Sequence, residues 1–112
     1  MVAQVELERM SVQEETEELN LKHANVCRAL ADPKRIKILY ALGHQPRHVS
    51  ALASDLNLPQ PTVSRHLRIL RQQSLVVGER NGPAVIYDIS DRRIIEVLDA
   101  VQEVMIDAAI RK

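Results

Sequence analysis

The sequence of 112 residues predicts one mainly α-helical domain that carries a β-hairpin, in the order four helices, hairpin, final helix. Three observations support this fold class. The chain has no Phe or Trp and only two Tyr, so its core is built from Leu, Ile, Val and Ala, which favours helices over a β-sandwich. Two short helical segments meet at a tight turn. A strand pattern surrounds Asn81-Gly82, a strong hairpin signal.

The N-terminal region predicts an arm followed by two helices. Residues 1–15 are rich in glutamate and lack a capping residue, so we expect a flexible acidic arm before a domain over residues 16–112. A helical pattern runs from about Thr16 to the residues before Asp32-Pro33. Asp32 is a good N-cap and Pro33 a good first helical residue, so a second helix starts there and ends near Gly43.

The middle of the chain predicts a helix-turn-helix. A third helix opens near Ser50 over the segment SALASDL, and the turn after it is short, from Asn57 to Gln60. A fourth helix then runs from Pro61, or one or two residues earlier, to about Gln72. Two helices joined by so few residues at a steep angle form this motif.

The C-terminal region predicts the hairpin and the last helix. Two β-branched runs flank Asn81-Gly82, and a two-stranded hairpin is marginal alone, so it must pack on the helices. Ser90 or Asp91 caps the last helix. Its apolar stripe is wide and contains Ile94, Leu98, Val101, Met105 and Ala108. The whole order is that of a winged helix-turn-helix, α-α-α-α-β-β-α.

The formal net charge is zero, but the charges are separated along the chain. Residues 1–20 hold six Glu and one Arg, whereas residues 21–71 hold nine Lys or Arg and two Asp. A basic region on a neutral protein indicates a polyanionic partner that meets one face. The single cysteine and the lack of an apolar run of about 20 residues predict a cytoplasmic protein with no membrane span.

The fourth helix has one apolar side and one basic side. Val63, Leu67 and Leu70 cluster on the predicted buried stripe, and Arg65 and Arg68 lie opposite. No carboxylate occurs in residues 59–77. Arginine pairs with guanine, glutamine with adenine, and hydroxyls with a base edge or a phosphate, so this helix has the chemistry of a major-groove reader.

The hairpin adds a second candidate contact. Arg80 lies next to the predicted tip, where a wing would follow the DNA backbone or touch the minor groove.

Three segments, RALADPKRIKILYAL, SALASDLNLPQPTVSRHLRILRQQSLV and GERNGPAVIYDI, resemble the ArsR/SmtB family of winged-helix repressors over residues 24–105. The resemblance implies a homodimer formed by the first and last helices, operator DNA as the partner, and release by a signal. It also implies an inverted-repeat site read by two helices roughly 34 Å apart. The residues that it places against the bases are Gln60, Thr62, Ser64, Arg65 and Arg68.

The chain departs from the family pattern at its cap and at its sensor sites. Pro59 stands where the family usually has Ser or Thr, which removes a capping hydroxyl. The third helix has no C-x-C pair, and Arg93 follows Asp91 where a histidine ligand is usual. The usual metal positions are therefore unfilled. We predict no cofactor, although a metal ion stays an alternative.

Two other pairs of residues are sensor candidates. His23 and Cys27 are four residues apart in the first helix, as are His44 and His48 around a turn, and each pair supplies only two ligands. A repressor that senses metal or oxidation through Cys27 is thus one alternative function. His66, beside the buried stripe, is interpreted as a packing or phosphate-contacting residue.

Two further function classes fit the sequence less well. The chain has no glycine-rich loop, carboxylate pair or nucleophile with an evident base, so we do not expect an enzyme. A winged-helix protein-interaction module without DNA binding is the other alternative, and the arginines of the fourth helix argue against it.

Overall fold

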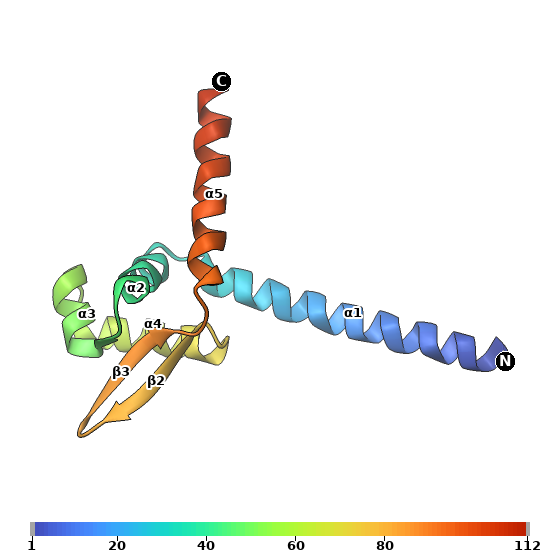
Figure 1. Ribbon diagram of the computed structural model, residues 1–112, viewed down its shortest axis with the longest axis horizontal. Coiled ribbons are helices and arrows are strands. Elements are labelled where there is room, and N and C mark those ends of the chain that lie inside the picture. Colours follow the sequence, from blue (N-terminus) through green and yellow to red (C-terminus); the bar gives the residue numbers. More distant parts are fainter. Residues whose placement is uncertain (1, 112) are drawn as a thin grey trace.

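The computed structural model describes the backbone of residues 2–111 and the side chains of residues 12–111. That part of the chain forms α1 (Val2–Leu30), α2 (Pro33–His44), β1 (Arg47–His48), α3 (Val49–Leu56), α4 (Gln60–Gln72), β2 (Val76–Asn81), β3 (Ala84–Ile89) and α5 (Arg93–Ile110). Helices α2, α3 and α4 and the sheet form a compact body, from which α1 and α5 project in different directions (Figure 1). The predicted winged helix-turn-helix is confirmed.

The structure differs from the sequence prediction at the N-terminus. Residues 2–15, expected to form a flexible arm, are the first half of α1. No Gly or Pro interrupts residues 2–30, and Glu, Gln and Leu favour helix, so the helix continues through the acidic stretch. Among the described side chains of α1, Val26, Ala29 and Leu30 at its C-terminal end pack on the body. A domain boundary after residue 15 stays a prediction.

The start of α2 follows the predicted capping pattern. Asp32 Oδ1 accepts hydrogen bonds from the backbone N–H groups of Lys34, at 2.8 Å, and Arg35, at 3.3 Å, and Pro33 occupies the first turn. Burial raises the pKa of Asp32, but these two hydrogen bonds and the charge of Arg35 outweigh it and lower the pKa below its ordinary value. The carboxylate is thereby kept charged at the helix N-terminus, where negative charge is favourable.

A left-handed residue makes the turn between α3 and α4. Asn57 has φ of 53°, and the N–H of Leu58 donates to the carbonyl of Ala53 at 3.0 Å, which closes α3. Pro59 then precedes α4 and provides no side-chain cap, as its ring requires. Its carbonyl accepts the first helical bonds, from the N–H groups of Thr62 and Val63.

The sheet has three strands in the order β1-β3-β2, and both pairings are antiparallel. Asn81 pairs with Ala84, so the two loop residues are Gly82 and Pro83, one position later than predicted. Gly82 has φ of 63°, a conformation that suits glycine at the start of a tight hairpin turn. Strand β1 was predicted as a turn, because two residues carry no strand pattern of their own.

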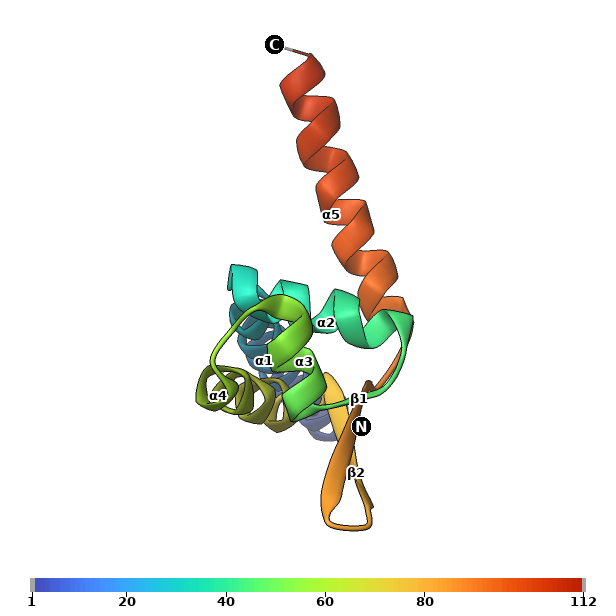
Figure 2. The ribbon, with the colours of Figure 1, turned by 90° about the vertical axis from the view of Figure 1, so that its left-hand side faces the viewer.

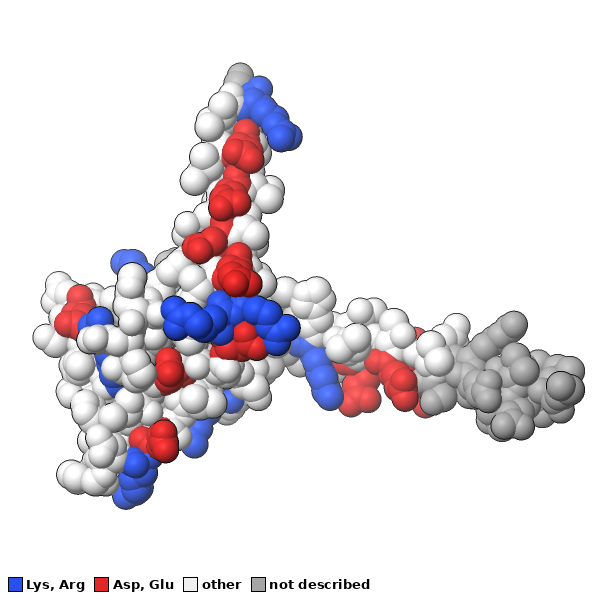
Figure 3. All heavy atoms as spheres, in the orientation of Figure 1, with Lys and Arg blue, Asp and Glu red and all other residues white. Residues whose placement is uncertain are grey.

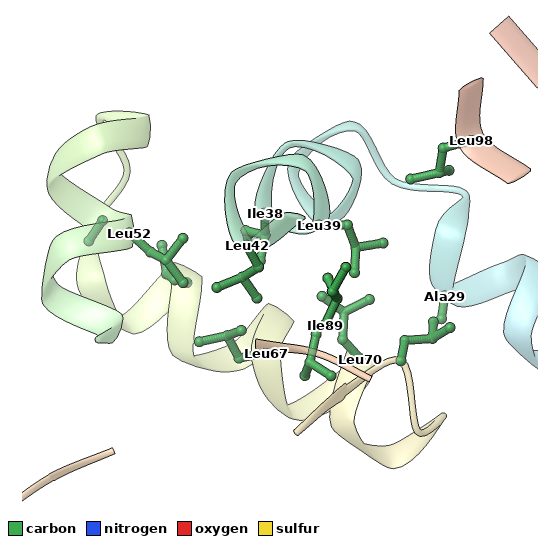
Figure 4. Close-up of a cluster of buried hydrophobic side chains, with 13 residues drawn as sticks. Ala29, Ile38, Leu39, Leu42, Leu52, Leu67, Leu70, Ile89 and Leu98 are labelled. Atoms are coloured by element: carbon green, nitrogen blue, oxygen red, sulfur yellow. The ribbon is translucent and has the colours of Figure 1, made fainter. Parts of the chain in front are cut away.

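The core lies where α2, α3, α4 and the sheet meet (Figure 4). Its largest fully buried side chains are Ile38, Leu39, Leu42, Leu52, Val63, Leu67, Leu70 and Val76. Helix α5 adds only Leu98 to the buried set, and Ala29 is the one buried side chain among those described in α1. The body therefore packs with little help from the outer parts of these two helices.

Candidate nucleic-acid interface

Helix α4 presents two chemically distinct faces. Val63, Leu67 and Leu70 are at most 1% exposed and hold the helix against the core. Arg65 and Arg68 are exposed on the other side. The predicted division into a buried stripe and a basic face is confirmed.

The sequence-predicted contact residues lie on two neighbouring elements. Gln60, Ser64, Arg65 and Arg68 are exposed on α4, and Thr62 beside them is half-buried. Arg80 is exposed near the end of β2, where it pairs with Val85. Both views place α4 and the hairpin at the end of the molecule away from the tip of α5 (Figures 1 and 2). One approaching ligand could therefore meet both elements.

A cleft of about 230 Å³ separates α4 from the wing. Its lining includes Ser64, Arg68, Arg71 and Tyr87. A Cβ on Gly78 of β2 would lie 3.1 Å from Tyr87 Cε1 and 3.4 Å from Arg71 Nη1, so this glycine lets the arginine and the tyrosine approach the wing backbone. A glycine inside a strand is the sequence sign of such a close approach.

The charge around α4 is one-sided. The helix carries no carboxylate. The nearby Asp55 of α3 forms an ion pair with Arg47, so its charge is compensated within the body. Acidic side chains gather instead along α5 (Figure 3), whose sequence contains Glu96, Asp99, Glu103 and Asp107. A polyanion would be attracted to the α4 end of the molecule and repelled by α5.

His66 occupies a buried position on α4. It is 6% exposed, and burial lowers the pKa of its imidazole. The charge of Asp32 acts in the opposite direction, and the cations Arg35, Arg65 and Lys34 each lower the pKa by a smaller amount. Its Nδ1 lies 3.2 Å from Arg35 Nη1. Of the two roles considered from the sequence, the position matches packing, because so little of the ring reaches the surface.

The sensor candidates His23 and Cys27 are both exposed on α1. They line a groove of about 670 Å³ between α1 and α5, together with Val26, Ile94 and Val97. Across the side chains described, no three His, Cys, Asp or Glu residues lie close enough together to hold a metal ion. Nor is any helix of the described chain long and apolar enough to cross a membrane.

Two other positions bear on metal binding. The carboxylate of Asp91 is bound by the guanidinium of Arg93, with Nη2 2.7 Å from Oδ2, and this contact lowers the pKa of Asp91 to about 2. His44 is exposed at the end of α2, whereas Nδ1 of His48 is buried without a hydrogen-bond partner.

Helices α1 and α5 expose a large apolar surface. The exposed fractions are 66% for Leu19, 68% for Val104 and 77% for Ile110, and Met105 is 66% exposed. The remaining large members of this set are Val12, Leu21, Val97, Val101 and Ile106. Monomeric proteins rarely leave so many large apolar side chains together on two helices, which indicates a protein interface.

Comparison with known sequences gives a consistent result. A family model described as "Bacterial regulatory protein, arsR family" matches residues 32–77. The HTH-type transcriptional repressor SmtB of Mycobacterium tuberculosis is 45% identical over 82 residues, which cover 72% of this chain and 61% of that protein. The chain thus spans about three fifths of the length of this relative.

Solved structures share the fold. The homodimeric winged helix-turn-helix DNA-binding domain of Mb0332 from Mycobacterium bovis aligns with a TM-score of 0.77 and 28% identity, covering 87% of this chain and 90% of that one. The crystal structure of M. tuberculosis Rv0081 aligns with a TM-score of 0.75 and 33% identity, covering 83% and 94% of the two chains.

Proposed function

Because this chain belongs to the arsR family of bacterial regulatory proteins, we propose that it is a transcriptional repressor that binds an inverted-repeat operator as a homodimer. The observation that carries the proposal is the exposed, acid-free face of α4, which is fixed by the buried Val63, Leu67 and Leu70 behind it. The proposed site of action is the cytoplasm.

In this proposal α4 enters the major groove. Arg65 and Arg68 donate to guanine O6 and N7, and Gln60 pairs with adenine. Thr62 and Ser64 contact a base edge or a phosphate. Arg80 lies beside the helix on the wing and contacts the backbone or the minor groove, so it adds affinity more than sequence selection.

The dimer would be formed by α1 and α5. Their exposed apolar side chains, among them Leu19, Val101 and Val104, have no cover in the single chain. A two-fold axis through these helices presents two copies of α4 to successive major grooves, roughly 34 Å apart. The homodimeric state of the Mb0332 domain supports this arrangement.

A thiol-responsive repressor is the second candidate. It is favoured by the exposure of Cys27, which an inert core cysteine would not have. Mass measurement after peroxide treatment tests it, with Cys27→Ser as the control. An adduct or a disulfide between two copies that appears only in the wild type and weakens DNA binding supports sensing. An unchanged mass would refute sensing by Cys27 and would mean that the repressor responds to another ligand.

The proposed function is tested by selecting DNA fragments that the purified protein retains, followed by gel shifts on the recovered duplex and on a random duplex. We expect an inverted repeat in the recovered fragments and a specific dissociation constant at least about a thousandfold below that for random DNA. The affinity should also fall steeply with salt, because phosphate contacts release counterions. Equal binding to both duplexes, or no binding at low salt, would refute it.

A further inference from the structure

The side chain of Arg35 joins the ends of two helices. It belongs to α2 and is only 14% exposed. Its Nε donates to the carbonyl of Ala29 at 2.6 Å and its Nη2 to the carbonyl of Arg28 at 3.3 Å. Both carbonyls belong to the last turn of α1, where partners within the helix run out. The carbonyl of Arg28 also accepts the N–H of Ala31 at 3.2 Å.

The same guanidinium reaches the middle of α4. Its Nη1 lies 3.2 Å from Nδ1 of His66, 31 positions further along the chain, and 3.9 Å from Oδ2 of Asp32. A guanidinium has donors and no acceptor. Nδ1 of His66 is therefore the acceptor, which requires a neutral imidazole that carries its proton on Nε2.

We propose that Arg35 is a positioning residue that fixes α4 relative to α1, and that the fixed arrangement needs a neutral His66. This inference rests on the proposed function. In a dimer held by α1 and α5, the distance and angle between the two copies of α4 depend on how each α4 is tied to its own dimer helix. A shift of α4 in each subunit mismatches the half-site spacing of the operator.

Protonation of His66 would break the link. It converts Nδ1 from an acceptor to a donor and places an imidazolium against the guanidinium. Among the charged groups that face the ring, Asp32 favours the proton, whereas Arg35 and Lys34 of α2 and Arg65 of α4 oppose it. Burial of the ring opposes the proton as well.

The expected direction of the pH effect follows from this balance. The neutral ring is favoured in the linked arrangement, so that arrangement is fully stabilised above the ordinary histidine pKa of about 6.5. As the pH falls below this value, the proton binds more readily to conformations in which the His66 ring has left Arg35. Those conformations are then favoured over the linked arrangement. Operator affinity should therefore fall on acidification.

The tautomer of His66 provides a test that does not involve DNA. In long-range ¹H–¹⁵N spectra at pH 7.5 we expect Nε2 to carry the proton and Nδ1 to be bare. A His66 ring with its proton on Nδ1, or a ring protonated on both nitrogens at that pH, would overturn the proposal.

Three variants test the link through operator affinity at pH 7.5 and pH 5.5. Arg35→Met removes the link. Lys37→Met is the matched control, because it also removes one positive charge from α2, but at an exposed position. His66→Asn keeps an acceptor near the Nδ1 position but does not titrate in this range. Circular dichroism verifies the folding of each variant.

We expect the operator affinity of the wild type to fall about tenfold from pH 7.5 to pH 5.5. One proton that binds only the released imidazole, with the ordinary histidine pKa of about 6.5, gives this factor one pH unit below that pKa. His66→Asn should change less than about threefold, Lys37→Met should follow the wild type, and Arg35→Met should bind about tenfold more weakly at pH 7.5. A His66→Asn protein with the wild-type pH profile, or equal binding by the two methionine variants, would overturn the proposal.

If Arg35→Met does not fold, His66→Asn and the tautomer decide the question. If the wild type binds no duplex, the proposed function fails, whereas the tautomer still decides whether the link exists.

Discussion

The hydroxyl of Tyr40 donates a hydrogen bond to Oδ1 of Asp99 at 2.7 Å, which joins the middle of α2 to the second turn of α5. This bond is the first cause of the raised pKa of Tyr40, since the neutral phenol is the donor. Arg92 adds a second link, from Nη2 to the carbonyl of Gly43 at 3.1 Å. These bonds anchor the base of a helix whose only buried side chain is Leu98.

Replacement of Tyr40 by Phe should lower the free energy of unfolding by about 1 kcal/mol, because one hydrogen bond between α2 and α5 is lost. Urea unfolding followed by circular dichroism measures the change. Asp99→Asn is the control, because its amide oxygen can still accept the bond, and it should lose less. Equal midpoints for Tyr40→Phe and the wild type would show that the bond adds nothing.

The turn before α4 depends on the left-handed conformation of Asn57. Asn57→Ala should destabilise the fold by about 1 kcal/mol, because the Cβ of alanine resists positive φ, whereas Asn57→Gly should be nearly neutral. The measurement is again urea unfolding of the two variants beside the wild type. A glycine variant as unstable as the alanine variant would mean that the asparagine side chain, and not the backbone conformation, is what matters.

Acid should weaken the start of α5. The pKa of Asp91 is lowered to about 2 by Arg93, and its Oδ1 also accepts the N–H of Arg93 at 2.8 Å. A carboxylate with a lowered pKa contributes stability above its ordinary value near 3.8, and this contribution is lost as the pH falls toward about 2.

We therefore expect wild type and Asp91→Ala to differ in melting temperature at pH 5 and to converge as the pH approaches about 2. Carboxyl NMR titration gives the pKa directly. A titration midpoint near 3.8, or a difference in melting temperature that stays constant with pH, would contradict the assignment.

The apolar face of α5 should hold the dimer together. Val101 is 53% exposed in the single chain, and Val101→Asp would place a charge in the proposed interface at a cost of several kcal/mol. Light scattering should then show a monomer where the wild type is a dimer. Gln102→Asp, at the neighbouring exposed position, is the control for added charge on the same helix. A Val101→Asp protein that remains dimeric would show that the dimer interface does not include this face of α5.

Local patterns predicted most of the body and of the candidate interface. The spacing of Val63, Leu67 and Leu70 defined the buried side of α4, and the pair Asp32-Pro33 marked the start of α2. These features succeed because a helix period and a cap are encoded within a few residues.

Features that depend on distant partners could not be found in this way. Strand β1 exists because Arg47 and His48 pair with β3, about 40 positions later. The contact between Arg35 and His66 likewise has no local pattern. The length of α1 was underestimated for a different reason. A glutamate-rich segment is compatible both with a solvated arm and with a helix that continues from a packed end.

Arg65→Ala decides whether the exposed face of α4 reads base pairs, when the affinity of this variant for the selected operator and for a random duplex is measured at fixed salt. We expect a loss of about 1 to 3 kcal/mol on the operator and a much smaller loss on random DNA, whereas Arg80→Ala should weaken binding to both duplexes more evenly. Equal losses on the two duplexes for Arg65→Ala would contradict base reading by this face.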